Sequence, residues 1–297
     1  MTGARRIGSR RRPVATRTVR LLCGVGALLL VAPSVGPAGA PGPIVGLDHI
    51  PVAVRDLDQA CATYRALGFV IKPGRPHTNG IRNAHVKFPD GSGIELITAG
   101  AAVDGLTTRY VQLIAQGEGP AFLALRARDP DRLVAALRSG GFPFSRDGDL
   151  TELRQPGLDW LFVVRDNRSP TDRPEHFDHR NGATALRAVW IATDAGAELE
   201  RFLAHLGGVS TRRLMSVPDP VTVPLVAVDR GEVAILPASR QLNAGRPIVG
   251  VSLHVDRVEL VGRQLSKAGF TPRVHTGAAP RVVVAPGETH GIWLEFR

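Results

Sequence analysis

One pattern recurs four times after residue 45 and restricts the fold more than any other feature of the sequence. Each copy contains an apolar strand, an acidic residue, an amphipathic helix closed by Gly, and a later apolar strand. The opening strands are 47–54, 122–128, 188–193 and 249–255, followed by Asp56, Asp129, Asp194 and Asp256. The closing strands are predicted at 94–97, 160–164, 233–236 and 292–296. Copies of about 65 residues are modules rather than solenoid repeats.

The helix in each copy follows from apolar side chains spaced 3.6 residues apart. In the first copy, Leu57, Cys61 and Tyr64 share one face behind Asp56, which suits an N-cap, and Gly68 ends the helix. A strand, a helix and further strands in each copy predict an α+β fold of four βαβββ modules, paired into two cupped half-barrel domains. A cupped sheet can hold a ligand on its concave face.

The domain boundaries follow from one long segment rich in turn-forming and charged residues. It contains Pro170, Pro174, Asn181 and Gly182. We expect one module pair at 44–166, a linker at 167–183 and the second pair at 184–297. His176 and His179 in this linker are expected to be solvated.

The first 40 residues have the layout of a secretory signal peptide. Residues 1–20 carry seven Arg and no acid, 21–32 is apolar, and Ala38-Gly39-Ala40 offers a small-residue cleavage site. We expect cleavage before Pro41 and export to the periplasm or the exterior. The apolar run is short of the roughly 20 residues that span a bilayer. An uncleaved anchor is the alternative, and the membrane would then be reached only through this leader.

Charge and cysteine content exclude several classes of protein. The formal charge of +10 falls to +3 without the seven Arg of the leader, and the remaining Arg are scattered with few aromatics between them. We therefore expect no nucleic-acid partner. Cys61 is the one cysteine after the leader, so no intrachain disulfide can form.

Strand alternation singles out one imidazole and one carboxylate in the first module. His49 lies on the strand face opposite to apolar Ile50 and Val52, and Glu95 lies on the face opposite to Ile94. Both side chains are therefore expected to face the cup. As a pair they suit Zn, Ni, Fe or Mn, with His77 or His85 as a third ligand. Direct hydrogen bonding to an organic ligand and plain packing are the two alternatives.

Several short motifs resemble the glyoxalase-like branch of the vicinal oxygen chelate superfamily. They are Leu47-Asp48-His49-Ile50, Arg55-Asp56-Leu57, Leu67-Gly68-Phe69, His77, Asn83, Gly93–Ile97 and Asn181-Gly182-Ala183. The resemblance implies a half-open barrel in which a divalent metal assists lyase, isomerase or dioxygenase chemistry on adjacent oxygen atoms. It assigns His49 and Glu95 as metal ligands or catalytic base, and His77 and Asn83 as substrate-positioning residues.

The second module departs from the family pattern. A full site takes ligands from both modules of a pair, but Phe122 stands at the position of His49, and the closing strand 160–164 has no Glu. In the third module Ala188 takes this position. A metal in the first cup would therefore need His77 or His85 in addition to His49 and Glu95.

The positions of other polar residues allow two interpretations each. Asn83, His85 and Lys87 share a strand face that is either the cup or the solvent side. Arg126 and Trp160 could give a substrate an anion contact and an aromatic wall, or be an edge Arg and a core Trp. In the last module, alternation predicts that His254 and Glu295 line the second cup.

The function expected from the sequence is binding of a small oxygen-rich molecule in the first cup by an exported glyoxalase-like protein. Metal-assisted lyase, isomerase or dioxygenase chemistry is the catalytic form of this hypothesis. The alternative is a non-catalytic protein that sequesters a small molecule. The third and fourth modules could instead serve assembly, and a homodimer is compatible with the sequence.

Overall fold

The computed structural model describes residues 42–216 and 219–297. The predicted signal peptide at 1–40 lies outside the described residues. Among the helices that are described, none has the length and apolar character needed to cross a membrane.

The first half of the described chain forms one nine-stranded mixed sheet. Its main strand order is β2-β3-β4-β1-β6-β9-β8-β7, and β5 pairs with β1. The strands are β1 (Ile44–Ala53), β2 (Lys72–Pro73), β3 (Ile81–Lys87), β4 (Gly93–Ala99), β5 (Gly119–Pro120), β6 (Leu123–Ala127), β7 (Phe144–Asp147), β8 (Leu150–Leu153) and β9 (Leu161–Val164). The helices are α1 (Leu57–Ala66), α2 (Gly105–Gln116) and α3 (Pro130–Ser139).

The second half of the described chain repeats this arrangement in an eight-stranded sheet. The strand order is β11-β12-β13-β10-β14-β17-β16-β15. The strands are β10 (Ala183–Ala192), β11 (Val209–Met215), β12 (Val221–Ala227), β13 (Glu232–Leu236), β14 (Ile248–Val255), β15 (Arg273–His275), β16 (Arg281–Val284) and β17 (Trp293–Phe296). Its helices are α4 (Gly196–His205) and α5 (Val258–Lys267), with short 3-10 turns η2 (Ala238–Arg240) and η3 (Pro286–Glu288).

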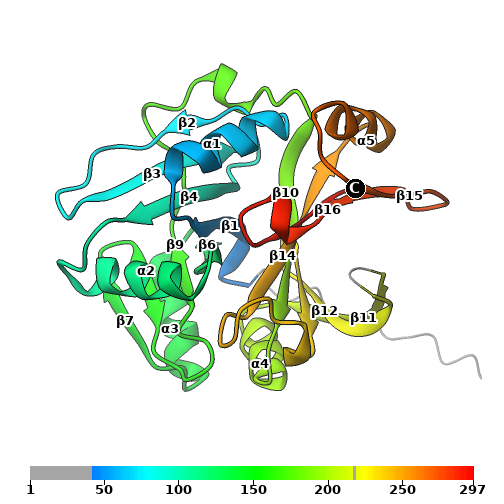
Figure 1. Cartoon of the computed structure of the whole chain (residues 1–297). Coiled ribbons are helices and arrows are strands. Elements are labelled where there is room, and N and C mark those ends of the chain that lie inside the picture. Colours follow the sequence, from blue (N-terminus) through cyan, green and yellow to red (C-terminus); the bar gives the residue numbers. More distant parts are fainter. Residues whose placement is uncertain (1–41, 217–218) are drawn as a thin grey trace, which may run out of the picture. The chain divides into compact units, whose positions relative to one another are not determined.

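The predicted fold of four βαβββ modules in two pairs is confirmed. In each sheet the first strands of two modules lie side by side at the centre, β1 beside β6 and β10 beside β14 (Figure 1). Each first strand also pairs in parallel with the closing strand of its own module, as β1 does with β4 and β14 with β17. The residues at the centre of each sheet therefore come from both modules of the pair.

The helices begin and end for different reasons in the two halves. Asp56 and Asp129 cap α1 and α3 through side-chain hydrogen bonds to backbone amides, as expected. The prediction that Asp194 and Asp256 start their helices in the same way is wrong. Ala195 and Arg257 take the N-cap positions there, and neither side chain makes a capping hydrogen bond. Helix α2 lies between the first two modules and was not predicted.

The first strand shows how the sheet separates its two faces. Ile50, Val52 and Val54 are fully buried in the apolar core, as their alternation predicts. Ile50 pairs with Ile94 of β4, and Val52 pairs with Leu96. This apolar layer fixes the register of β1 and β4, and thereby the positions of the polar side chains on the opposite face.

The connecting segment, residues 165–182, packs onto the first sheet. It contains the 3-10 turn η1 (Pro174–Phe177). The expectation that His179 is solvated is wrong, because its side chain is buried between β3 and the end of α1. Its Nδ1 accepts a hydrogen bond from the Val70 amide at 3.0 Å, and its Nε2 donates to the Lys87 carbonyl at 3.0 Å. Burial outweighs these contacts and lowers the pKa of His179 to about 4.

Arg246, before β14, ties the second half of the chain to the turn around β5. The guanidinium is buried and donates hydrogen bonds to the carbonyls of Leu113, Gly117, Gly119 and Pro120. Burial without a carboxylate partner lowers the pKa of Arg246 to about 10. The bound carbonyls lie in the last turn of α2, just after it and in β5, so this residue holds α2 and β5 in place.

Candidate functional site

The polar face of the first sheet carries a cavity of about 380 Å³, which we call the first cup. Strands β1, β3 and β4 form its floor, and β2 with the residues after it forms one wall. The connecting segment forms another wall. The lining residues are His49, Lys72, Pro73, Gly74, Arg75, His77, Asn83, His85, Lys87, Glu95, Asp166, Asn167, Arg168, Ser169, Pro170 and Thr171.

His49 and Glu95 meet on the floor of the first cup, as alternation predicts. In the parallel pairing of β1 with β4, His49 lies opposite Gly93 and Glu95 lies opposite Pro51. The imidazole and the carboxylate therefore meet diagonally across the two strands. His49 Nε2 lies 3.5 Å from Glu95 Oε2, and the side chains are 14% and 12% exposed. The pair is nearly enclosed but is still reached from the cavity.

Asp48 orients the imidazole from the other side and is a site residue that the sequence analysis missed. His49 Nδ1 lies 2.6 Å from Asp48 Oδ1. Strict alternation would put neighbouring side chains on opposite faces, but the pairing of β1 with β6 is irregular between Leu47 and His49. Asp48 is fully buried, and its second oxygen binds Arg126 Nε at 3.1 Å. A carboxylate thus holds the imidazole with Nε2 toward the cavity.

The two carboxylates determine the charge of the imidazole. Burial disfavours the charged form of His49, but hydrogen bonds and charge interactions with Asp48 and Glu95 outweigh it and raise its pKa to about 9. Burial likewise disfavours the charged form of Glu95, but His49, His85 and Asn83 lower its pKa to about 2. Near neutral pH the first cup therefore presents an imidazolium next to a carboxylate.

The strand face with Asn83, His85 and Lys87 is turned to the cup, which decides between its two readings. Asn83 Nδ2 donates to Glu95 Oε1 at 2.6 Å, and His85 lies opposite Glu95 in the pairing of β3 with β4. Burial lowers the pKa of His85, so this imidazole is neutral. Asn83 Oδ1 and His77 Nε2 are buried, and neither has a hydrogen-bond partner among the described residues. Two buried polar atoms beside the cup are therefore unpaired within the described chain.

Arg126 and Trp160 lie outside the first cup. Arg126 binds Asp48 and the carbonyl of Asp90, so its connection with the cup runs through Asp48. The indole of Trp160 is buried and donates a hydrogen bond to the Gly157 carbonyl at 2.7 Å. Trp160 is therefore a core Trp, whereas Arg126 is not at an edge, because it lies on the central strand β6 and is ion-paired with Asp48.

Lysines that line the cup are held by a carboxylate of the connecting segment. Asp172 forms ion pairs with Lys72 of β2 and with Lys87 of β3, the second at 2.8 Å. Both ammonium groups are buried, with side chains 9% and 4% exposed. The Lys87 ammonium also donates to the Asn167 carbonyl. These contacts fix the wall formed by residues 166–171.

The donor set of the first cup is incomplete for a metal ion. The distance of 3.5 Å between His49 Nε2 and Glu95 Oε2 is one that two ligands of a single ion can have. Within residues 42–216 and 219–297, however, no three side chains of His, Cys, Asp or Glu are gathered in a metal-binding arrangement. Phe162 lies against His49, with ring centroids 5.7 Å apart, and Phe122 packs on Phe162 at 6.3 Å. Aromatic rings thus stand where the second module would supply ligands, so these residues do not make a full metal site.

A family comparison identifies the class of protein. Residues 47–207 match the family described as glyoxalase-like domain, which is more than half of the chain. The chain therefore belongs to the glyoxalase-like domain family, and the resemblance to the vicinal oxygen chelate superfamily is confirmed. A search of curated proteins found no match.

Solved structures with the same fold include several dioxygenase relatives. A xylose isomerase-like TIM barrel/4-hydroxyphenylpyruvate dioxygenase fusion protein is 12% identical with a TM-score of 0.64, over 90% of this chain and 50% of its own. The present chain thus spans half the length of that fusion protein. The 2,3-dioxygenase LapB from Pseudomonas sp. KL28 is 14% identical with a TM-score of 0.61, over 86% and 93% of the two chains. A mutant of 4-hydroxymandelate synthase from Streptomyces coelicolor is 12% identical with a TM-score of 0.63, over 86% and 92%. At these identities the likeness is one of fold.

Proposed function

We propose that the first cup binds a small, oxygen-rich molecule through direct hydrogen bonds to His49 and Glu95. The observation that carries this proposal is the convergence of these two side chains, at 3.5 Å, on the floor of a cavity of about 380 Å³. Neither group is needed to hold the sheet together, because the apolar residues on the opposite face of β1 and β4 fix the register. A buried charged pair at the base of a cavity is typical of a binding site.

The chemistry of the ligand follows from the donors and acceptors that face the cavity. The His49 imidazolium donates from Nε2, and the carboxylate of Glu95 accepts. A molecule with a carbonyl or carboxylate oxygen beside a hydroxyl group could satisfy both at once. Asn83 Oδ1 and His77 Nε2, which lack partners within the described chain, would serve further oxygen or nitrogen atoms. The site therefore favours neighbouring oxygen atoms over a long apolar body.

Isothermal titration calorimetry with paired probes tests the proposal. Lactate carries a hydroxyl group beside its carboxylate, and propionate lacks the hydroxyl group. We expect lactate to bind more tightly than propionate at neutral pH. The substitutions His49→Ala and Glu95→Gln should each weaken lactate binding by about tenfold or more, since a hydrogen bond to a charged group contributes roughly 1.5–3 kcal/mol.

A matched control is available in the second sheet. His254 is an imidazole whose side chain is 49% exposed and pairs with Asp256 at 3.6 Å. The substitution His254→Ala should leave lactate binding unchanged. Equal affinity for lactate in the original chain and in both first-cup variants would overturn the proposal.

Metal-assisted chemistry is the second candidate function. It is favoured by the His49–Glu95 distance and by Asp48, which orients the imidazole as a carboxylate orients many metal-bound histidines. In that case His49 and Glu95 would be ligands of Zn, Ni, Fe or Mn, and the ion would supply Lewis-acid stabilisation for lyase, isomerase or dioxygenase reactions. Elemental analysis of the purified protein distinguishes the two candidates. Stoichiometric metal that is lost in both His49→Ala and Glu95→Ala would favour the second.

Export is proposed on the leader sequence alone. The apolar run at 21–32 and the small residues at 38–40 support cleavage before Pro41. N-terminal sequencing of protein secreted by a producing cell should begin near Pro41. Protein that starts at Met1 and stays with the cells would contradict cleavage.

A further inference from the structure

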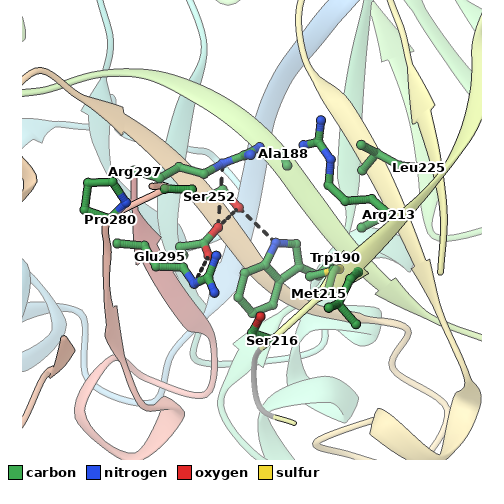
Figure 2. Close-up of a pocket in the computed structure, with 14 residues that line it drawn as sticks. Ala188, Trp190, Arg213, Met215, Ser216, Leu225, Ser252, Pro280, Glu295 and Arg297 are labelled. Atoms are coloured by element: carbon green, nitrogen blue, oxygen red, sulfur yellow. Dashed lines mark hydrogen bonds and ion pairs between the residues drawn. The ribbon is translucent and has the colours of Figure 1, made fainter. Parts of the chain in front are cut away.

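The second sheet has a cavity of its own, of about 390 Å³, which we call the second cup. We propose that it binds a small organic carboxylate with an apolar body, independently of the ligand of the first cup. Strands β14, β16 and β17 supply polar lining residues, β10, β12 and β13 supply apolar ones, and β11 supplies Arg213 as well as Leu214 and Met215. Figure 2 shows Ser252, Glu295 and Arg297 on one side of the cavity, and Arg213, Met215 and Leu225 on the other.

The apolar side of the second cup comes mainly from β11. Leu214 is 61% exposed and lines the cavity together with Met215 and Leu225. Trp190, Ala188 and Ala234 also line it but are almost completely buried. A ring or short hydrocarbon placed against Leu214 and Met215 would be partly removed from water.

The polar side contains a chain of hydrogen bonds that is already complete. The Trp190 indole donates to Ser252 Oγ at 3.0 Å, and Ser252 donates to Glu295 Oε2 at 2.5 Å (Figure 2). Glu295 was predicted to line this cup and does so, whereas His254 points to solvent and pairs with Asp256. The donors of Trp190 and Ser252 are thus used within the protein and are not left for a ligand.

Two arginines beside these hydrogen bonds have N–H donors that are not satisfied within the described residues. Arg281 Nε lies 3.8 Å from Glu295 Oε1, and Arg297 Nε lies 3.6 Å from Glu295 Oε2, which is beyond hydrogen-bond distance. Both Nε atoms are buried and unpartnered among the described residues. Arg297 reaches Glu232 with its other nitrogen at 2.8 Å, but the guanidinium of Arg281 makes no hydrogen bond to any described residue. Arg281 is thus ion-paired with Glu295 and keeps donors that a ligand in the second cup could use.

The class of ligand follows from the guanidinium of Arg281, whose N–H donors lie next to apolar side chains. A planar guanidinium matches the two oxygens of a carboxylate in a bidentate arrangement.

The second cup also differs from the first in its chemistry. Ser252 lies opposite Glu295 as Pro51 lies opposite Glu95, and Gly250 lies opposite Trp293 as His49 lies opposite Gly93. The repeat therefore keeps the carboxylate but has glycine in place of the imidazole.

Calorimetric titration of the full chain with phenylacetate tests this inference. Phenylacetate should bind saturably, and phenylacetamide, which has the same shape without the charge, should bind at least tenfold more weakly. The substitution Arg281→Gln should weaken phenylacetate binding by tenfold or more. Leu214→Ser, which removes apolar surface from the cavity without changing any charge, should weaken it by roughly threefold or more.

Two control variants make the test specific. Arg212 is an exposed residue of β11 next to Arg213 and does not line the cavity, so Arg212→Gln should leave binding unchanged. His49→Ala should also leave phenylacetate binding unchanged, because His49 belongs to the first cup. Lack of saturable binding, or equal affinity for the amide, would overturn the inference. Loss of binding in His49→Ala but not in Arg281→Gln would also overturn it, without affecting the proposal for the first cup.

Discussion

The imidazole of His49 and the carboxylate of Glu95 lie 3.5 Å apart, although they are not register partners in the pairing of β1 with β4. The contact is diagonal across the two strands. Asp48 binds the imidazole and Asn83 binds the carboxylate, at 2.6 Å each. The four side chains form one row across β1, β4 and β3, held by two hydrogen bonds and the His49–Glu95 ion pair.

This row of side chains predicts how the pKa of His49 changes when Asp48 loses its charge. Asp48→Asn removes a negative charge next to Nδ1 while keeping the shape of the side chain, so the pKa of His49 should fall from about 9. Titration of the His49 ring signals by NMR measures this directly. Asp58→Asn, at an exposed carboxylate on α1, is the control and should leave the His49 pKa in place. An unchanged His49 pKa in Asp48→Asn would contradict the described row.

The same shift predicts a dependence of stability on pH. The pKa of His49 is raised from 6.5 to about 9 in the folded chain, so its stabilisation is complete below pH 6.5 and is lost as the pH rises through about 9. The free energy of unfolding in urea should therefore fall more in the original chain than in His49→Gln between about pH 6 and about pH 9.5. Glu95 acts with the opposite sign, since its lowered pKa stabilises the fold above pH 4.5 and this contribution is lost toward about pH 2. Parallel pH curves for the original chain and His49→Gln would argue against the raised pKa.

Much of this architecture could be predicted from the sequence because it depends on short-range periodicity. Alternation of apolar and polar residues with a period of two placed Ile50 on the core side of β1 and His49 on the cup side, and the structure agrees. The 3.6-residue spacing placed α1 and α3 correctly behind Asp56 and Asp129. The same argument put Glu95 and Glu295 on the concave faces of their sheets.

Other features depend on long-range contacts or strand irregularities, which the periodicity of apolar residues cannot predict. Asp48 joins the site because β1 is irregular at that point, whereas alternation alone puts it on the opposite face. His179 and Asp172 lie in a segment that looks like a solvated linker, yet their partners are about 100 residues earlier in the chain. Polar side chains in a turn-rich segment carry no signal that distinguishes a long-range contact from exposure to water.

The connecting segment provides a test of its own. Asp172→Asn removes the carboxylate shared by the buried ammonium groups of Lys72 and Lys87. Breaking a buried ion pair in this way should lower the free energy of unfolding by roughly 3–5 kcal/mol. Equilibrium unfolding in urea measures the change. Glu175→Gln, at a side chain that is 64% exposed and 3.9 Å from Arg173, should change stability by less than about 1 kcal/mol. Equal, small effects of the two substitutions would show that Asp172 does not hold the segment.

Arg246 gives a second test of how the described chain is held together. Arg246→Met keeps the apolar stem but leaves buried carbonyls around Gly117 and Gly119 without donors. The loss should be at least about 3 kcal/mol in the free energy of unfolding, because each unsatisfied buried group costs roughly 1–3 kcal/mol. Arg240→Met removes an ion pair with exposed Asp219 and should cost no more than about 1 kcal/mol. Thermal or urea unfolding of the two variants compares them, and similar losses would contradict the role of Arg246.

The most direct test of the central claim is an NMR titration of the full chain with lactate, following the ring signals of His49 and the indole signal of Trp190. Binding in the first cup predicts that the His49 signals shift saturably, that the shift disappears in Glu95→Gln, and that the Trp190 signal does not move. Saturable binding that moves the Trp190 signal and leaves the His49 signals in place would contradict the assignment of the first cup as the site for oxygen-rich ligands.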